Sequence, residues 1–187
     1  MLSDVVRVPH AQAMLARVAP GLDPVALGSV SDNVLDGYRA VAPHLAAEPG
    51  ADVLIVCHGL KSVPLYGARP IRTDFDKPER RYRIVVDAGL TPNGLRYAIR
   101  ATAPEATLQC VSFYAGGDVP MPLGRLYTLG IRFFSGRAHA AALLPQVMRL
   151  IEAGRLRPEE VTTRVVDWEE APAAYVEPAI KLVVWRT

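Results

Sequence analysis

Residues 84–113 read IVVDAGLTPNGLRYAIRATAPEATLQCVSF, and this stretch decides the fold class. Its first part, residues 84–89, is an apolar and β-branched run that ends in glycine, as a buried parallel strand does. A capping threonine followed by proline then opens a helix at residues 91–92, and apolar residues recur at helical spacing at Leu95, Ile99 and Ala103. A second apolar run, residues 107–113, has the length and composition of a strand. Strand, helix and strand in this order predict a parallel α/β unit.

The same alternation extends in both directions along the chain. Upstream, residues 52–56 form another buried strand, which follows an amphipathic helix that starts at Val34 and stops at Pro49-Gly50. Downstream, residues 131–134 predict a fourth strand, and residues 137–153 have the clearest helical pattern in the chain, with Gly154 as its stop. We therefore predict an α/β fold with a mainly parallel sheet flanked by helices.

The two ends of the chain differ from this central region. Residues 4–8 predict a short strand, and Asp23-Pro24 is a helix-start signal. Residues 161–166 alternate as a half-buried strand does, and residues 168–175 predict a short helix. Residues 180–185 predict a final strand.

Composition excludes several classes of protein. The chain has 187 residues, which suits one ordinary domain, and its net charge of +2 includes no block of like charge, so nucleic-acid binding is not indicated. No apolar run has the length of a membrane helix and no signal peptide is visible, so we expect a cytoplasmic protein. The two cysteines, Cys57 and Cys110, lie in apolar runs and predict buried thiols rather than a disulfide framework.

The turn after residues 52–56 is where a dinucleotide-binding fold would hold the pyrophosphate. Taking Gly59 as the first glycine of a G-x-G-x-x-G turn puts Lys61 and Pro64 at the other two glycine positions, and Ser62 lies between them. The charge of Lys61 would partly compensate for the lost glycine. We name Gly59, Lys61 and Ser62 as candidate cofactor-binding residues, and an ordinary structural turn is the alternative.

The spacing after this turn is short for a complete nucleotide-binding half. The span from Asp52 to Phe75 is below the roughly 30 residues of a βαβ unit, and the span from Asp76 to Arg83 is below the dozen or so that a parallel crossover needs. At least one strand and one helix should therefore be missing. Asp74 lies somewhat closer to Gly59 than the usual ribose-binding acid does, and a solvated charged loop is its alternative role.

Taken together and in order, these segments resemble the C-terminal, cofactor-binding part of zinc-dependent alcohol dehydrogenases of the medium-chain dehydrogenase/reductase family. Residues 22–41 are similar to that family's linker helix, and residues 50–56 to its first cofactor strand. Residues 85–89 and 95–100 are similar to its fourth strand and the helix that follows. Residues 136–145 and 169–181 are similar to its closing region. The resemblance covers nearly the whole chain.

This resemblance implies an incomplete Rossmann-like sheet with short remnants of a catalytic domain at both ends. Residues 1–22 would be one remnant, residues 23–155 the linker helix and shortened cofactor-binding domain, and residues 156–187 a segment that returns to the catalytic-domain side. The implied activity is hydride transfer between an alcohol and NAD or NADP, with zinc polarising the alcohol oxygen.

The same resemblance implies that the zinc chemistry is lost. Family members hold catalytic zinc with a Cys and a His far upstream of the linker helix, and this chain has no counterpart for either. Asp32 falls near the position of the third ligand and would be a lone former zinc ligand, because a catalytic zinc needs three protein ligands. The two cysteines also cannot form the family's four-cysteine structural zinc site. The catalytic residues are therefore unknown, zinc is not expected to be retained, and we expect little or no activity from the chain alone.

Three further residues are candidates for the nicotinamide side of the cofactor. Asp87, Gly89 and Ser112 end predicted strands on the side of a parallel sheet where ligands lie. With two of the three phosphate-turn glycines replaced, NAD or NADP would be held weakly.

Two other classes of function stay open from the sequence. The first is a non-catalytic Rossmann-like module for dimerisation or weak nucleotide binding, in which residues 117–132 would lie near a homodimer contact. The second is a marginally folded product with exposed apolar surface. A separately encoded catalytic domain is a further implied partner, whereas nucleic acid and membrane are not.

Overall fold

The structure, a computed structural model, describes residues 3–57, 75, 77–179 and 181–186. The chain divides into two compact units, each described here by itself. One unit comprises residues 36–137, and the other comprises residues 1–35 together with residues 138–187. The domain boundaries expected at residues 22 and 155 stay predictions.

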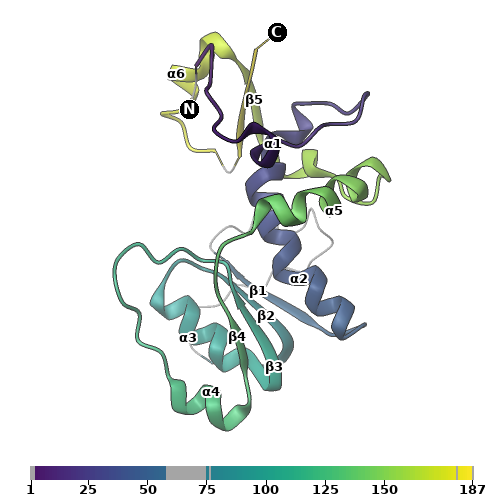
Figure 1. The fold of residues 1–187 in the computed structure, drawn as a ribbon. Coiled ribbons are helices and arrows are strands. Elements are labelled where there is room, and N and C mark those ends of the chain that lie inside the picture. The colour runs from purple at the N-terminus through teal and green to yellow at the C-terminus, as the bar shows by residue number, and fades with distance from the viewer. Residues whose placement is uncertain (1–2, 58–74, 76, 180, 187) are drawn as a thin grey trace. The chain divides into compact units, whose positions relative to one another are not determined.

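The unit of residues 36–137 is built on one parallel sheet of four strands (Figure 1). The strands are β1 (Val53–Cys57), β2 (Tyr82–Ala88), β3 (Thr102–Cys110) and β4 (Arg132–Phe134), and they lie in the order β1-β2-β3-β4. Every neighbouring pair is parallel. The predicted α/β class with a parallel sheet is therefore confirmed.

The strand order agrees with one half of a Rossmann-like sheet. In the complete order 3-2-1-4-5-6, the first strand is followed on one side by strands 4, 5 and 6. The described sheet has that order when β1 is taken as the first strand, and within the described ranges no strand lies beyond β1. The described part of the sheet is accordingly the 1-4-5-6 portion of such a fold.

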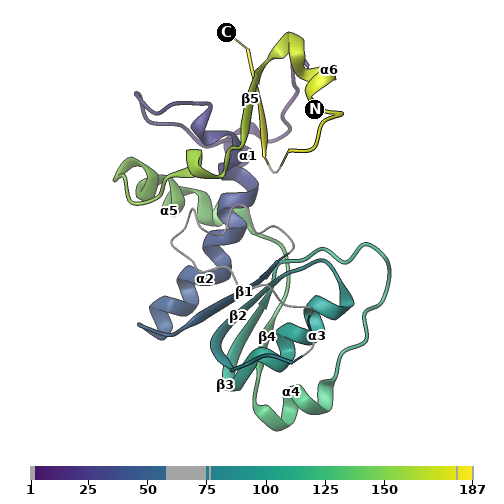
Figure 2. The same ribbon diagram turned by 180° about the vertical axis from the view of Figure 1, so that it is seen from behind.

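Helix α3 (Pro92–Ala101) covers one face of this sheet (Figure 2). The helix begins where Thr91 accepts a hydrogen bond from the Gly94 amide at 3.1 Å, with Pro92 at the first helical position. Its apolar side packs on the sheet in a buried core that includes Val56, Val85, Leu95, Ile99, Leu108 and Leu126.

Strand β3 begins earlier and ends earlier than the sequence predicts. It starts at Thr102, directly after α3, whereas we predicted that the helix would continue to Ala103 and that the strand would start at residue 107. The Thr102 hydroxyl donates to the Ala98 carbonyl at 2.8 Å and ends the helix. Glu105 has a positive φ of 55°, and the register with β2 shifts in this part of the strand. The irregular first half of β3 has no alternating pattern by which it could be recognised.

Helix α2 (Leu35–Ala47) corresponds to the predicted amphipathic helix. A 3-10 turn, η1 (Ala26–Ser29), and a π-helical turn, η2 (Val30–Val34), precede it. The helix reaches the sheet face opposite α3, because His44 Nε2 lies 3.2 Å from Gln109 Oε1, and Gln109 alternates with core residues of β3.

Helix α4 (Leu123–Leu129) was not predicted from the sequence. The Leu126 side chain packs against the core, and Gly130 ends the helix with φ of 62°. Its short length and exposed apolar residues leave no helical stripe to detect.

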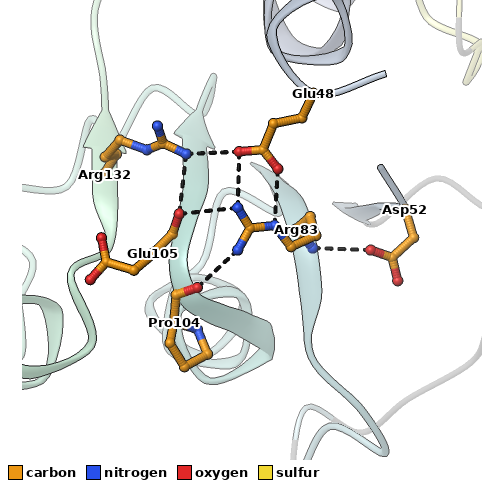
Figure 3. Close-up of polar contacts among 6 residues, drawn as sticks. All are labelled: Glu48, Asp52, Arg83, Pro104, Glu105 and Arg132. Carbon is orange, nitrogen blue, oxygen red and sulfur yellow. Dashed lines mark hydrogen bonds and ion pairs between the residues drawn. The ribbon is translucent and has the colours of Figure 1, made fainter. Parts of the chain in front are cut away.

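An ion-pair cluster joins the end of α2 to the amino-terminal edge of the sheet (Figure 3). The Glu48 carboxylate accepts hydrogen bonds from Arg83 at 2.9 and 3.0 Å and from Arg132 at 2.9 Å. Both arginines also donate to the Glu105 carbonyl, and Arg83 donates to the Pro104 carbonyl. The two arginines therefore hold the strained turn of β3 in place.

The unit of residues 1–35 and 138–187 contains a second, two-stranded parallel sheet. Besides η1 and η2, its elements are α1 (Ala11–Met14), α5 (Ala140–Glu152), η4 (Pro158–Val161), β5 (Arg164–Asp167), η5 (Trp168–Glu170), α6 (Ala171–Ala174) and β6 (Leu182–Trp185). Strands β5 and β6 pair with each other, and Arg186 stacks over the Trp168 ring at 3.9 Å.

The strand predicted at residues 4–8 is wrong. These residues form no strand, and Val5 and Val6 are largely exposed. A β-branched run becomes a strand only where a neighbouring strand pairs with its backbone, and in the described sheets no strand pairs with this segment.

None of the helices in the described ranges is long and apolar enough to cross a membrane.

Candidate functional site

The candidate site lies at the carboxyl-terminal ends of β2 and β3. Parallel strands end at the same edge, and Asp87 of β2 lies in register with Cys110 of β3. In open parallel α/β sheets, ligands bind outside this edge. The ends of the two strands and the loops that follow them bring together five residues. We call these residues the Asp87 cluster: Asp87, Gly89, Cys110, Ser112 and Tyr114.

Asp87 is at the centre of this cluster, and its side chain is 0% exposed. One carboxylate oxygen, Oδ1, accepts a hydrogen bond from the Gly89 amide at 3.2 Å. The other, Oδ2, accepts from the Tyr114 hydroxyl at 2.7 Å and from the Cys110 thiol at 3.3 Å. The chain itself thus satisfies both oxygens of this buried carboxylate.

The Tyr114 and Cys110 side chains stay protonated in this arrangement. Burial, followed by the nearby charge of Asp87, raises the pKa of the Cys110 thiol to about 11. Burial and the hydrogen bond to Asp87 likewise raise the pKa of the Tyr114 hydroxyl. Both groups therefore act as hydrogen-bond donors at neutral pH, and Cys110 is not a thiolate nucleophile.

Ser112 links the two loops a second time. Its hydroxyl donates to the Asp87 carbonyl at 3.2 Å and accepts from the Leu90 amide at 3.1 Å. Leu90 has φ of 54°, a left-handed conformation that is uncommon for leucine, and its side chain is 60% exposed. Phe113, next to Ser112, is 83% exposed. The outer side of both loops thus presents apolar side chains to solvent.

Gly89 has a packing position in this site. It is buried, and a Cβ atom at Gly89 would lie 3.6 Å from both the Gly94 Cα and the Val56 Cγ1. These are ordinary van der Waals distances, so the packing of the end of β2 on the start of α3 leaves room for a Cβ atom at this position. The structure brings three predicted residues, Asp87, Gly89 and Ser112, to one edge of the sheet. Their contact with a cofactor stays a prediction.

The predicted phosphate turn cannot be compared with the structure. Gly59, Lys61, Ser62 and Asp74 lie outside the residues that the structure describes.

The described residues do not fit a zinc site. Across the described ranges, no group of three or more His, Cys, Asp or Glu side chains could hold a metal ion. Asp32 lies exposed in η2, and the side chain of its neighbour Asn33 accepts a hydrogen bond from Lys181. We therefore derive no chemical step through zinc.

Sequence reasoning missed the roles of Cys110 and Leu90, and it placed Tyr114 at this edge of the sheet without its bond to Asp87. The alternation of Leu108 and Cys110 in β3 places the thiol on the core face, but only the register between strands puts it beside Asp87. Tyr114 lies beyond the end of the strand, and no sequence period predicts where its hydroxyl reaches. The positive φ of Leu90 has no sequence signal, because glycine or asparagine usually fills such a position.

Comparison with known proteins gives a structural likeness and no sequence match. No family model matches the chain, and no curated protein sequence matches it. The fold is similar to the alcohol dehydrogenase TADH from Thermus sp. ATN1, with a TM-score of 0.83 and 20% identity over 96% of this chain. It is also similar to a zinc dependent alcohol dehydrogenase 2 from Streptococcus pneumonia, with a TM-score of 0.72 and 19% identity over 91% of this chain.

A third similar structure contains a bound nucleotide. A short chain alcohol dehydrogenase from E. coli CFT073, in complex with the cofactor NADH, matches 90% of this chain with a TM-score of 0.64 and 16% identity. The chain covers 65%, 59% and 61% of these three proteins and so spans less than two thirds of their length. At these identities the likeness shows the fold alone. The expected resemblance to the cofactor-binding part of alcohol dehydrogenases is confirmed at that level.

Proposed function

We propose that this chain is a nicotinamide-nucleotide-binding module of an alcohol dehydrogenase-like oxidoreductase, which binds NAD or NADP weakly at the carboxyl edge of its sheet. The observation that carries the proposal is the Asp87 cluster, which orders two loops at the edge where parallel sheets bind ligands. The fold likeness to a dehydrogenase in complex with NADH supports it.

The residues proposed to contact the nucleotide have different tasks. The backbone at Gly89 and Leu90 and the Ser112 side chain would face the nicotinamide half. Asp87 would hold these groups in position without contacting the nucleotide, since both of its carboxylate oxygens already accept hydrogen bonds from the protein. Gly59, Lys61, Ser62 and Asp74 are proposed for the phosphate and ribose half. The bound nicotinamide would supply the hydride-transfer chemistry.

We propose that the chain alone turns over alcohols slowly or not at all. Hydride transfer from an alcohol needs a group that withdraws the hydroxyl proton or polarises its oxygen, and the described residues offer no metal cluster for this. A separately encoded catalytic domain would supply it. A stoichiometric zinc ion in the purified chain would contradict this part of the proposal.

The test is a titration of the purified protein with NADH and NADPH, followed by nucleotide fluorescence and calorimetry. We expect saturable binding with a dissociation constant of about 1 mM or somewhat tighter, equivalent to about 4 kcal/mol. We expect no alcohol-dependent NADH formation with or without added zinc. The absence of any binding at millimolar nucleotide would overturn the proposal.

A second candidate function is a dimerisation module. Exposed apolar side chains occur on α4, where Leu123 and Tyr127 are 68% and 89% exposed, and on β4, where Phe133 and Phe134 are partly exposed and lie at the edge of the described sheet. Large exposed apolar side chains favour an interaction surface where they form a contiguous patch. Light scattering should then give a dimer, and Tyr127→Glu should shift it to a monomer. A monomeric wild type would count against this function.

A further inference from the structure

The loops after β2 and β3 are held to each other by side chains and not by their backbones alone. The Tyr114 hydroxyl reaches from the second loop to Asp87 Oδ2 at 2.7 Å and lies 3.4 Å from the Thr91 carbonyl of the first loop. Thr91 is also the N-cap of α3. One hydroxyl therefore touches both the end of β2 and the start of the next helix.

Among the residues that the structure describes, no cation donates a hydrogen bond to Asp87. Its three donors are the Gly89 amide, the Cys110 thiol and the Tyr114 hydroxyl, of which the hydroxyl lies closest. A buried carboxylate needs such donors, because an unpaired buried charge is strongly unfavourable. Loss of the Tyr114 hydroxyl would leave Oδ2 with the weak thiol donor alone, and the loop that contains Gly89 and Leu90 would lose its closest support.

The conformation of Leu90 depends on the same support. A leucine at φ of 54° persists only where its surroundings hold it. The Leu90 amide is held by Ser112, whose hydroxyl in turn donates to the Asp87 carbonyl. Asp87 thus accepts a hydrogen bond from Tyr114 at its carboxylate and another from Ser112 at its backbone carbonyl. Both donors lie in the loop after β3.

We propose that Tyr114 is a positioning residue for the nicotinamide half of the bound nucleotide. It acts through Asp87 by holding the Gly89–Leu90 backbone against the loop that contains Ser112. This inference rests on the proposed function and assigns a role that nucleotide contact alone does not reveal. The pyrophosphate of a dinucleotide binds at the turn after the first strand, whereas Tyr114 follows β3, which β2 separates from β1 in the sheet. The contribution of Tyr114 should therefore be confined to one half of the ligand.

The test compares two probes on the full chain, NADH and ADP-ribose, where ADP-ribose lacks the nicotinamide. Tyr114→Phe removes the hydroxyl and keeps the ring. We expect it to weaken NADH binding about tenfold, the effect of a lost hydrogen bond to a charged group, while ADP-ribose affinity changes less than about twofold. A general loss of structure would weaken both probes alike. Tyr175→Phe, which removes the hydroxyl of another exposed tyrosine, is the matched control and should change neither.

The outcomes separate this inference from the function on which it rests. If the wild type binds ADP-ribose and NADH but Tyr114→Phe leaves the NADH affinity unchanged or weakens both probes alike, the positioning role is wrong and the proposed function stands. If the wild type binds neither probe, both are wrong. Thermal unfolding of the variant verifies that it is folded. If it is not, Asp87→Asn, which removes the charge of the group that accepts from the Tyr114 hydroxyl and keeps an amide oxygen in its place, replaces it, and the same difference between the two probes is expected.

Discussion

At the scale of single residues, the turn around Gly130 shows how local backbone conformation limits the sequence. Gly130 ends α4 with φ of 62°, and a Cβ there would overlap the Glu105 carboxylate. The Glu105 side chain can rotate away from this position. The left-handed backbone conformation is the part of the turn that disfavours any residue with a side chain.

Gly130→Ala should therefore lower the free energy of unfolding by about 1 kcal/mol, the cost of a left-handed conformation for alanine. Gly124 lies inside α4 with open space around it. Gly124→Ala should act in the opposite direction and raise stability by about 0.5–1 kcal/mol. Urea denaturation measures both. Destabilisation of similar size by the two variants would contradict the role given to Gly130.

Glu48 is a second residue whose effect can be stated in advance. Its hydrogen bonds from Arg83, together with those from Arg132, lower the pKa of the Glu48 carboxyl below its ordinary value of 4.5. A lowered pKa means that the folded state favours the charged form. The stabilisation is therefore present above the unfolded-state pKa and is lost as pH falls through the folded-state pKa.

Glu48→Gln should accordingly lower the melting temperature at pH 7 and reduce the loss of stability between about pH 5 and pH 3. The exposed Glu79, in the same unit, serves as the control, since Glu79→Gln should leave the pH profile close to that of the wild type. Equal profiles for wild type and Glu48→Gln would show that the ion-pair cluster does not contribute.

At the scale of elements, helix α3 is positioned by its cap. Thr91→Ala removes the oxygen that accepts from the Gly94 amide while the backbone stays the same. The expected loss is about 1 kcal/mol of unfolding free energy. Thr128→Ala on exposed α4, where the hydroxyl bonds only to carbonyls of its own helix, should change stability by less than half of this. Denaturation curves in which Thr128→Ala loses more unfolding free energy than Thr91→Ala would contradict the role of Thr91 as the cap of α3.

The elements also show which features could be predicted from the sequence. Strands β1 and β2 and helix α3 have apolar periods and cap residues that act locally, and they were found close to their observed bounds. Helix α4 and the early start of β3 depend on contacts with residues far along the chain, such as Glu105 with Arg83 and Arg132. The Asp87 cluster was predicted in part, because the ends of strands are visible in the sequence and the reach of Tyr114 is not.

At the scale of the whole molecule, the superposition on the alcohol dehydrogenase TADH includes 96% of this chain and 65% of that protein. The described sheet has the strand order of one half of a Rossmann-like fold, and the described residues include no cluster that could hold a metal ion. We therefore propose that two properties that go together in a complete dehydrogenase are separate here: binding of the cofactor, which this chain would retain, and chemistry on the alcohol, for which it would need a partner.

The most direct test of that account is a nuclear magnetic resonance titration of the isotope-labelled chain with NADH. We predict that the amide signals of Gly89, Leu90 and Ser112 shift in a saturable manner, while those of Arg83 and Arg132 at the opposite edge of the sheet stay in place. Shifts confined to the amino-terminal edge, or no shifts at millimolar NADH, would contradict the claim that this sheet binds a nucleotide at its carboxyl edge.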